Sequence, residues 1–175
     1  PIPLAAALAQ RTKKIRIGFA ILQMAIHHPT RILLQTSLLD NLLNGRLTVG
    51  IGRGSKFNEF EYVAFGVDGD ETEHRERMFE GVDYMKKAWQ ANGEPLNYNG
   101  NFFNLSIPGV RPKPVQTPHP LIQMSGSSNE TLAWAAINNC QIMLPRMGIE
   151  IAVERLNFYK EQMESAGHSE QSVQN

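Results

Sequence analysis

Apolar and polar positions alternate along the chain in blocks that predict an α/β protein. The near-continuous apolar run over residues 15–22 is typical of a strand buried on both faces. A second strand is predicted over residues 47–52, where Leu47, Val49 and Ile51 alternate with small or polar residues. Between them, Pro29 suits the first turn of a helix, and Asn44-Gly45 is a typical helix end. The positions that should form the apolar stripe of this helix are Ile32, Leu33, Gln35, Thr36, Leu39, Leu42 and Leu43.

The remaining chain continues the alternation of helical and extended patterns. Strands are predicted over residues 121–126 and 141–144. Helices are predicted over residues 4–10, 71–89, 129–138 and 149–166, the last of them ended by Gly167. Residues 56–60 have a loop-like composition.

Two segments interrupt this alternation. Asn99-Gly100 lies between aromatic segments and predicts a β-hairpin over residues 94–106, as an excursion from the main sheet. Residues 111–120 contain too many prolines for a helix or a central strand. We expect a stiff, extended connection there.

The order of strands and helices predicts parallel βα units with helices covering the sheet. About four core strands are visible, whereas a closed (β/α)₈ barrel has eight and typically about 250 residues. The pattern alone therefore leaves two alternatives, a small open sheet or a piece of a barrel. In both, the carboxyl ends of the strands form the expected ligand edge, where Arg53 and Ser127 lie.

Composition narrows the class of protein. The 175 residues are 42% hydrophobic, enough for one domain with a substantial core. Seventeen basic residues balance seventeen acidic ones without a run of either sign, so charge gives no argument for nucleic acid or an anionic membrane as partner.

The same sequence bears on cellular location. Cys140 is the only cysteine, which excludes a disulfide within one chain, and its apolar surroundings predict a small buried residue. No apolar stretch has the length of a membrane span, and the first residues lack the basic flank of a signal peptide. We therefore expect a cytoplasmic protein, and the missing methionine suggests that Pro1 is not its natural start.

Gly52-Arg53-Gly54 is the first candidate for binding chemistry. The glycines allow positive φ or close approach to a ligand, and Arg53 offers a planar, permanently charged fork that matches phosphate oxygens. Such a charge-assisted hydrogen bond contributes about 1.5–3 kcal/mol. The alternative is an ordinary turn with a solvated arginine. A dinucleotide fingerprint is excluded, because Ser55 occupies the position of its third glycine and no helix pattern opens there.

The second candidate follows the strand over residues 121–126. A predicted helix opens there, so its first N–H groups and the hydroxyls of Ser127, Ser128 and Thr131 suit an anion. The alternative is structural, because Ser127 and Glu130 have the spacing of a capping box and Glu130 repels an anion. Two strand ends of one sheet, each with phosphate-suited groups, favour a shared phosphate site.

These residues resemble the bacterial luciferase-like, flavin-dependent oxidoreductases. The resemblance covers nearly all of the chain up to about residue 144, and its segments are specific in this order and spacing. They are residues 11–18, 27–31, 38–40, 44–47, 50–54, 65–66, 112–120, 131–132 and 134–136. The family fold is a (β/α)₈ TIM barrel, which implies that residues 1–175 are a single barrel domain present as an internal fragment, truncated at both ends.

The resemblance implies a flavin-dependent monooxygenase that uses reduced FMN and O₂ on a small apolar substrate. In the cofactor-binding set, Arg53 matches the position that holds the phosphate, and Ser128 and Thr131 match its hydroxyl partners. Gly52 lies where the strand passes near the flavin. Gly54 and Ser127 complete the set of cofactor-binding residues. Two alternatives remain: F420-dependent hydride transfer on the same fold, or a non-catalytic flavin-binding partner subunit.

The family's catalytic histidine usually follows the second barrel strand, in a segment that would precede Pro1, so no catalytic residue is assigned. His27 and His28 match the start of a helix, where we expect capping and loop packing. No third ligand has a suitable spacing, so no metal is expected. The resemblance also implies a homo- or heterodimer and a flavin reductase as partner.

Overall fold

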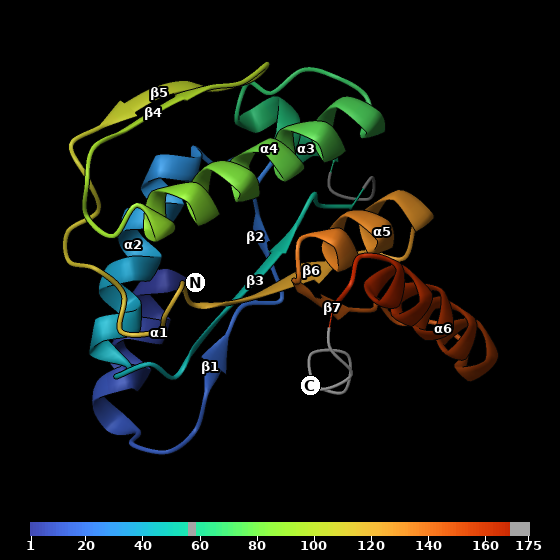
Figure 1. Cartoon of the computed structure of the whole chain (residues 1–175), viewed down its shortest axis with the longest axis horizontal. Coiled ribbons are helices and arrows are strands. Elements are labelled where there is room, and N and C mark those ends of the chain that lie inside the picture. The colour runs from blue at the N-terminus through green and yellow to red at the C-terminus, as the bar shows by residue number, and fades with distance from the viewer. Residues whose placement is uncertain (56–58, 169–175) are drawn as a thin grey trace. The chain divides into compact units, whose positions relative to one another are not determined.

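The computed structural model describes residues 1–55 and 59–168 (Figure 1). The chain forms two compact units, Pro1–Leu121 and Ile122–Asn175. Each unit is described by itself below.

The first unit contains a parallel sheet centred on β3 (Leu47–Gly52). β1 (Ile17–Gly18) and β2 (Leu22–Gln23) both pair with β3 in parallel, with Ile17 opposite Leu47 and Leu22 opposite Ile51. Every residue of β3 is buried. The predicted strand over residues 47–52 is thereby confirmed, including its end at Gly52.

The strand predicted over residues 15–22 is only partly present. Two two-residue strands replace it, separated by residues 19–21, where the Ala20–Ile21 peptide is cis. Of its apolar residues, Phe19 and Leu22 are buried, whereas Ile15 is 57% exposed. The prediction of burial on both faces is therefore wrong, because Gly18 and Ala20 are also exposed and Ile17 and Ile21 are only partly buried.

α2 (Pro29–Leu42) packs against α1 (Ile2–Arg11), α4 (Glu71–Gln90) and β3. It begins at Pro29 as predicted, and positive φ angles of 49° at Asn44 and 77° at Gly45 turn the chain after its end. The predicted stripe is right at five positions. Gln35 and Leu42 are wrong, since both are exposed, while the polar Ser37 and Asp40 are buried in their place.

Hydrogen bonds explain why the carboxylate of Asp40 lies on the buried face of α2. Its side chain accepts hydrogen bonds from the backbone N–H groups of Val115 and Gln116, at 2.8 and 2.9 Å, and from Nε2 of Gln116 at 2.7 Å. The same Nε2 donates to the carbonyl of Leu47 at 2.9 Å. Asp40 therefore ties the proline-rich connection to α2, and Gln116 ties it to β3.

α3 (Glu59–Ala64) was not expected. The loop-like segment 56–60 was predicted without it; residues 56–58 lie outside the described residues, but Glu59 already begins the helix. The six residues of α3 form a single helical turn and a half, too short for a clear amphipathic period. α3 places Tyr62 beside the end of β3, where its hydroxyl meets the carbonyl of Arg53, and Glu61 beside Gln23 of β2.

An antiparallel hairpin follows α4. β4 (Leu96–Asn99) pairs with β5 (Asn104–Ile107), and Figure 1 shows this hairpin as a ribbon of its own. The two oxygens of the Glu80 carboxylate accept hydrogen bonds from three successive backbone N–H groups, those of Asn101, Phe102 and Phe103, at 2.7–3.2 Å. The α4 side chain thus fixes the loop of the hairpin.

The second unit has a βαβα order. β6 (Leu121–Ser125) pairs in parallel with β7 (Gln141–Met143), and α5 (Asn129–Ile137) connects them. α6 (Ile149–Ser165) packs on α5, and the Tyr159 hydroxyl donates to the carbonyl of the buried Cys140 at 2.8 Å. No helix in the described part of the chain is long and apolar enough to cross a membrane.

Candidate functional site

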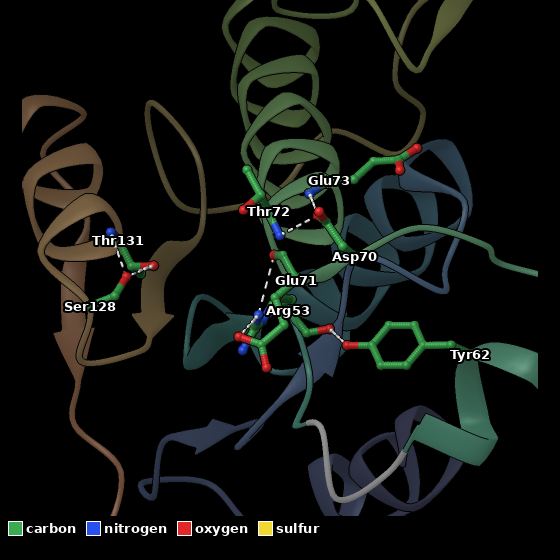
Figure 2. Close-up of polar contacts among 8 residues, drawn as sticks. All are labelled: Arg53, Tyr62, Asp70, Glu71, Thr72, Glu73, Ser128 and Thr131. Carbon is green, nitrogen blue, oxygen red and sulfur yellow. Dashed lines mark hydrogen bonds and ion pairs between the residues drawn. The ribbon is translucent and has the colours of Figure 1, made fainter.

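Arg53 directly follows the carboxyl end of β3, and its guanidinium meets the first residue of α4 (Figure 2). Nη1 lies 2.9 Å from Oε2 of Glu71 and donates to the backbone carbonyl of Glu71 at 3.2 Å. Both contacts are made by the same nitrogen, so the edge formed by Nε and Nη2 is not engaged by Glu71. The pair is partly solvated, with 25% of the Arg53 side chain and 60% of the Glu71 side chain exposed.

The backbone at Arg53 is held from α3. The Tyr62 hydroxyl donates to the Arg53 carbonyl at 2.8 Å, and burial raises the pKa of Tyr62, which keeps it a neutral donor. Gly54 has φ +111°, and a Cβ there would lie 2.5 Å from the Tyr62 hydroxyl and 2.8 Å from Nε2 of Gln23. The expectation of positive φ is therefore confirmed at Gly54.

Gly52 has a different role. It is the last residue of β3 and keeps an extended conformation. A Cβ at Gly52 would overlap the end of the Ile21 side chain, so the close approach at this position is to the chain itself.

A cavity of about 410 Å³ opens beside Arg53. The acidic residues Asp68, Asp70 and Glu71 line it, together with Tyr62 and His74, whose rings stack 4.1 Å apart at an interplanar angle of 5°. Three carboxylates against one guanidinium repel an anion from this side. An anion that binds Arg53 is therefore favoured at the edge formed by Nε and Nη2, which Glu71 does not engage.

Asp70 caps α4 at the border of this cavity. Its Oδ1 accepts the backbone N–H groups of Thr72 at 2.8 Å and Glu73 at 2.9 Å, and these hydrogen bonds hold the pKa of Asp70 below its usual value. The cap fixes the first turn of α4 and hence the position of Glu71.

The start of α5 in the second unit carries the other candidate residues. The Ser128 hydroxyl accepts the backbone N–H of Thr131 at 3.3 Å and donates to the Thr131 hydroxyl at 3.2 Å (Figure 2). The predicted capping box with Ser127 is thus wrong by one residue, because α5 begins at Asn129 and Ser128 is its N-cap. Ser127 is half-buried in the turn before the cap, and Thr131 is buried.

The structure brings Ser128 and Thr131 together in one unit, and Arg53, Gly52 and Gly54 in the other. In chemical terms both sets fit a phosphate: a guanidinium at a strand end, and hydroxyls at a helix start whose first N–H groups have no acceptor within the helix.

His27 and His28 are packing residues in the structure. The His27 ring meets Phe65 edge-on at 5.8 Å, and the His28 ring meets Phe103 at 6.0 Å. Burial, then the nearby Arg31 charge, lowers the pKa of His27. His28 occupies the N-cap position of α2, but its side chain makes no capping hydrogen bond. Within residues 1–55 and 59–168, no three His, Cys, Asp or Glu side chains are grouped to hold a metal.

Sequence reasoning missed Glu71, Tyr62 and Asp70 as neighbours of Arg53. Asp70 had a detectable signal, since an aspartate three residues before Glu73 has capping-box spacing. Glu71 and Tyr62 had none, because their contacts with Arg53 depend on how α3 and α4 return to the end of β3.

Comparisons with known proteins identify what the chain resembles. The model of the luciferase-like monooxygenase family matches residues 1–174. The oxygenase component of a flavin-dependent trigonelline monooxygenase from Acinetobacter baylyi is 29% identical over 139 residues, which are 79% of this chain and 37% of that protein. An F420-dependent glucose-6-phosphate dehydrogenase from Microbacterium testaceum is 28% identical over 134 residues, which are 75% of this chain and 38% of that protein.

A solved structure gives the same result at the level of fold. The monooxygenase RslO1 from Streptomyces bottropensis superimposes with a TM-score of 0.86 at 27% identity, covering 97% of this chain and 50% of that one. The predicted fold class, part of a luciferase-like α/β barrel, is thereby confirmed. The chain spans about half of this structure and less than two fifths of the two relatives.

Proposed function

Since the chain belongs to the luciferase-like monooxygenase family, we propose that the protein is a flavin-dependent monooxygenase that uses reduced FMN and O₂ on a small apolar organic substrate. The observation that carries this proposal is the family match over residues 1–174, supported by the monooxygenase relatives. The flavin supplies the oxygen chemistry when bound, and the chain's own residues supply binding and orientation.

Arg53 is the proposed phosphate ligand. It lies at the carboxyl end of a buried strand, the edge at which barrel enzymes bind their ligands. Its backbone is held by the Tyr62 hydroxyl and its guanidinium by the backbone carbonyl of Glu71, so less side-chain entropy remains to be lost on binding. The guanidinium edge that Glu71 does not engage matches two phosphate oxygens.

The start of α5 is the proposed second part of the phosphate site. Ser128 and Thr131 already satisfy each other, so their hydroxyls would add donors only by rotating towards the phosphate. The first N–H groups of α5 and the positive end of its dipole favour an anion without such a change. Ser127, Gly52 and Gly54 are proposed to line the cofactor, with no charge of their own.

Binding of FMN and riboflavin tests the phosphate site, because the two flavins differ only in the phosphate. On the protein that contains this chain, Arg53→Ala should weaken FMN binding by about tenfold or more and leave riboflavin binding nearly unchanged. Arg31→Ala, which removes an exposed arginine of α2, is the matched control and should affect neither. Equal loss of both flavins in the Arg53 variant would contradict the proposal.

F420-dependent hydride transfer is the second candidate function, favoured by the likeness to an F420-dependent dehydrogenase. Titration with each cofactor, followed by absorbance, separates the two. Binding of F420 without binding of FMN would replace the first proposal. Binding of FMN without O₂-dependent product formation would favour a non-catalytic, flavin-binding partner subunit.

We propose a separate flavin reductase as partner, because the trigonelline enzyme that the chain resembles is an oxygenase component. Product formation from the purified protein should then require added reductase and NAD(P)H, or chemically reduced FMN. A homo- or heterodimer remains the expected assembly.

A further inference from the structure

The Arg53–Glu71 pair joins the proposed phosphate ligand to a carboxylate. Oε2 of Glu71 lies 2.9 Å from Nη1, within the range of a charge-assisted hydrogen bond. Glu71 is the first residue of α4, and the Asp70 cap fixes that turn. The carboxylate is therefore held at the capped start of α4.

Charge decides what this pair does to a phosphate. Two like charges a few ångströms apart repel each other, and solvent screens this repulsion only partly at a partly solvated site. Asp68 and Asp70 line the same cavity and add to the negative potential. A phosphate at Arg53 must therefore share the guanidinium with a carboxylate or displace it.

The hydrogen bond from Arg53 to the Glu71 carbonyl positions the guanidinium independently of the charge on the Glu71 side chain. Nη1 donates to this backbone oxygen at 3.2 Å, which holds the guanidinium near α4 whatever the side chain at position 71. The carboxylate is thus not needed to place Arg53, and its main effect on an incoming anion is repulsive.

We infer that Glu71 is an internal competitor for the phosphate of the cofactor at Arg53, and that it lowers the affinity for phosphorylated flavin. The inference rests on the proposed function of Arg53. A cofactor that must arrive reduced and leave oxidised benefits from a phosphate contact that is strong enough to select FMN and weak enough to release it.

Glu71→Gln provides the test, since it removes the charge and keeps the backbone carbonyl and the size of the side chain. FMN should bind about two- to fivefold more tightly to this variant, the range expected from the loss of one partly exposed ion pair. Riboflavin affinity should not change. The gain should shrink at about 0.5 M NaCl, where exposed charges are screened.

Glu73→Gln is the matched control. It makes the same charge change in the same turn of α4, and Glu73 is not the residue that contacts Arg53. FMN affinity should change less than twofold. An equal gain in both variants would assign the effect to general potential and overturn the inference.

The remaining outcomes separate this inference from the proposed function. If Arg53→Ala weakens FMN binding but Glu71→Gln leaves it unchanged or weakens it, Glu71 is no competitor and only the inference fails. If Arg53→Ala leaves FMN binding unchanged, the phosphate is held elsewhere and the proposed site fails with it.

Discussion

Two carboxylates of the first unit, Asp40 and Glu71, differ in nearly every physical respect. Asp40 is fully buried and accepts three hydrogen bonds from Val115 and Gln116. Glu71 has a side chain that is 60% exposed and pairs with one nitrogen of Arg53. We call the region around Asp40 closed, because its carboxylate and the N–H groups of Val115 and Gln116 satisfy each other's hydrogen bonds within the fold. The region around Arg53 keeps one edge of a charged group for another partner.

This difference separates groups that hold the structure from groups that bind. A buried carboxylate without its donors would be costly, so the contacts of Asp40 persist in every state of the folded chain. An exposed ion pair contributes little to stability and can be exchanged at low cost. Glu71 and Arg53 therefore suit a site where a ligand arrives and leaves.

The largest expected effect breaks the closed region. Asp40→Ala removes the acceptor of three hydrogen bonds, from the N–H groups of Val115 and Gln116 and from Nε2 of Gln116, which should lower the free energy of unfolding by about 3 kcal/mol. Urea denaturation measures this loss. Glu71→Ala is the matched control and should cost less than about 1 kcal/mol, because the ion pair is partly exposed and Arg53 keeps its hydrogen bond to the carbonyl of residue 71. A similar loss in both variants would contradict the distinction between the two regions.

The second prediction concerns the backbone beside Arg53. Gly54→Ala places a Cβ at φ +111° against Tyr62 and Gln23, and should lower the free energy of unfolding by about 2 kcal/mol. Because this also shifts Arg53, FMN affinity should fall. Gly66→Ala is the control: it has φ +65° with open space around the new Cβ, so its cost should be about 1 kcal/mol and flavin binding should not change. Equal costs would mean that Tyr62 and Gln23 do not confine this turn.

The sequence predicted the fold well where a local pattern decides the structure. β3 alternates apolar with small or polar residues and is rich in β-branched side chains, and Pro29 and Asn44-Gly45 have strong preferences at helix ends, so these bounds could be predicted from the residues alone. It failed at residues 15–22 and at α3. Pairing partners decide how much of an apolar run is strand, and six residues are too few to show a helical period.

The candidate site was predictable in its groups and not in their partners. Arg53 and Ser128 carry chemistry that their position after a strand already indicates. Which serine caps α5 depended on a one-residue difference in where the helix begins, and helix bounds are seldom defined that closely by sequence. Glu71 is 18 residues from Arg53, and only the return of α4 to the strand end brings them together.

The third prediction asks whether the comparison extends to the second unit. The Ser128 hydroxyl serves Thr131 within the same turn, which makes it a structural group like Asp40. Ser128→Ala should therefore lower the free energy of unfolding by about 1 kcal/mol, the usual cost of losing an N-cap. Ser127→Ala is the matched control and should change it by less than about 0.5 kcal/mol. A larger loss of stability in Ser127→Ala than in Ser128→Ala would instead indicate that the capping box starts at Ser127.

The smallest effect tests an intermediate case. Asp70 accepts two backbone N–H groups, as Asp40 does, but it is solvent-exposed, as Glu71 is. These hydrogen bonds lower the pKa of Asp70 in the folded state, so its stabilising effect is present above its unfolded value of about 3.9 and is lost as the pH falls through the folded pKa.

Thermal unfolding of the wild type and Asp70→Ala as a function of pH measures this effect. The wild type should have the higher Tm above about pH 5, and the two curves should converge in more acidic solution, where the protonated carboxyl is a weaker acceptor. Asp70→Asn keeps a neutral capping oxygen at every pH, so its Tm should stay above that of Asp70→Ala by a constant amount. A constant difference between the wild type and Asp70→Ala would show that charge does not strengthen the cap, and that Glu71 is positioned by the helix start without help from the ionised Asp70.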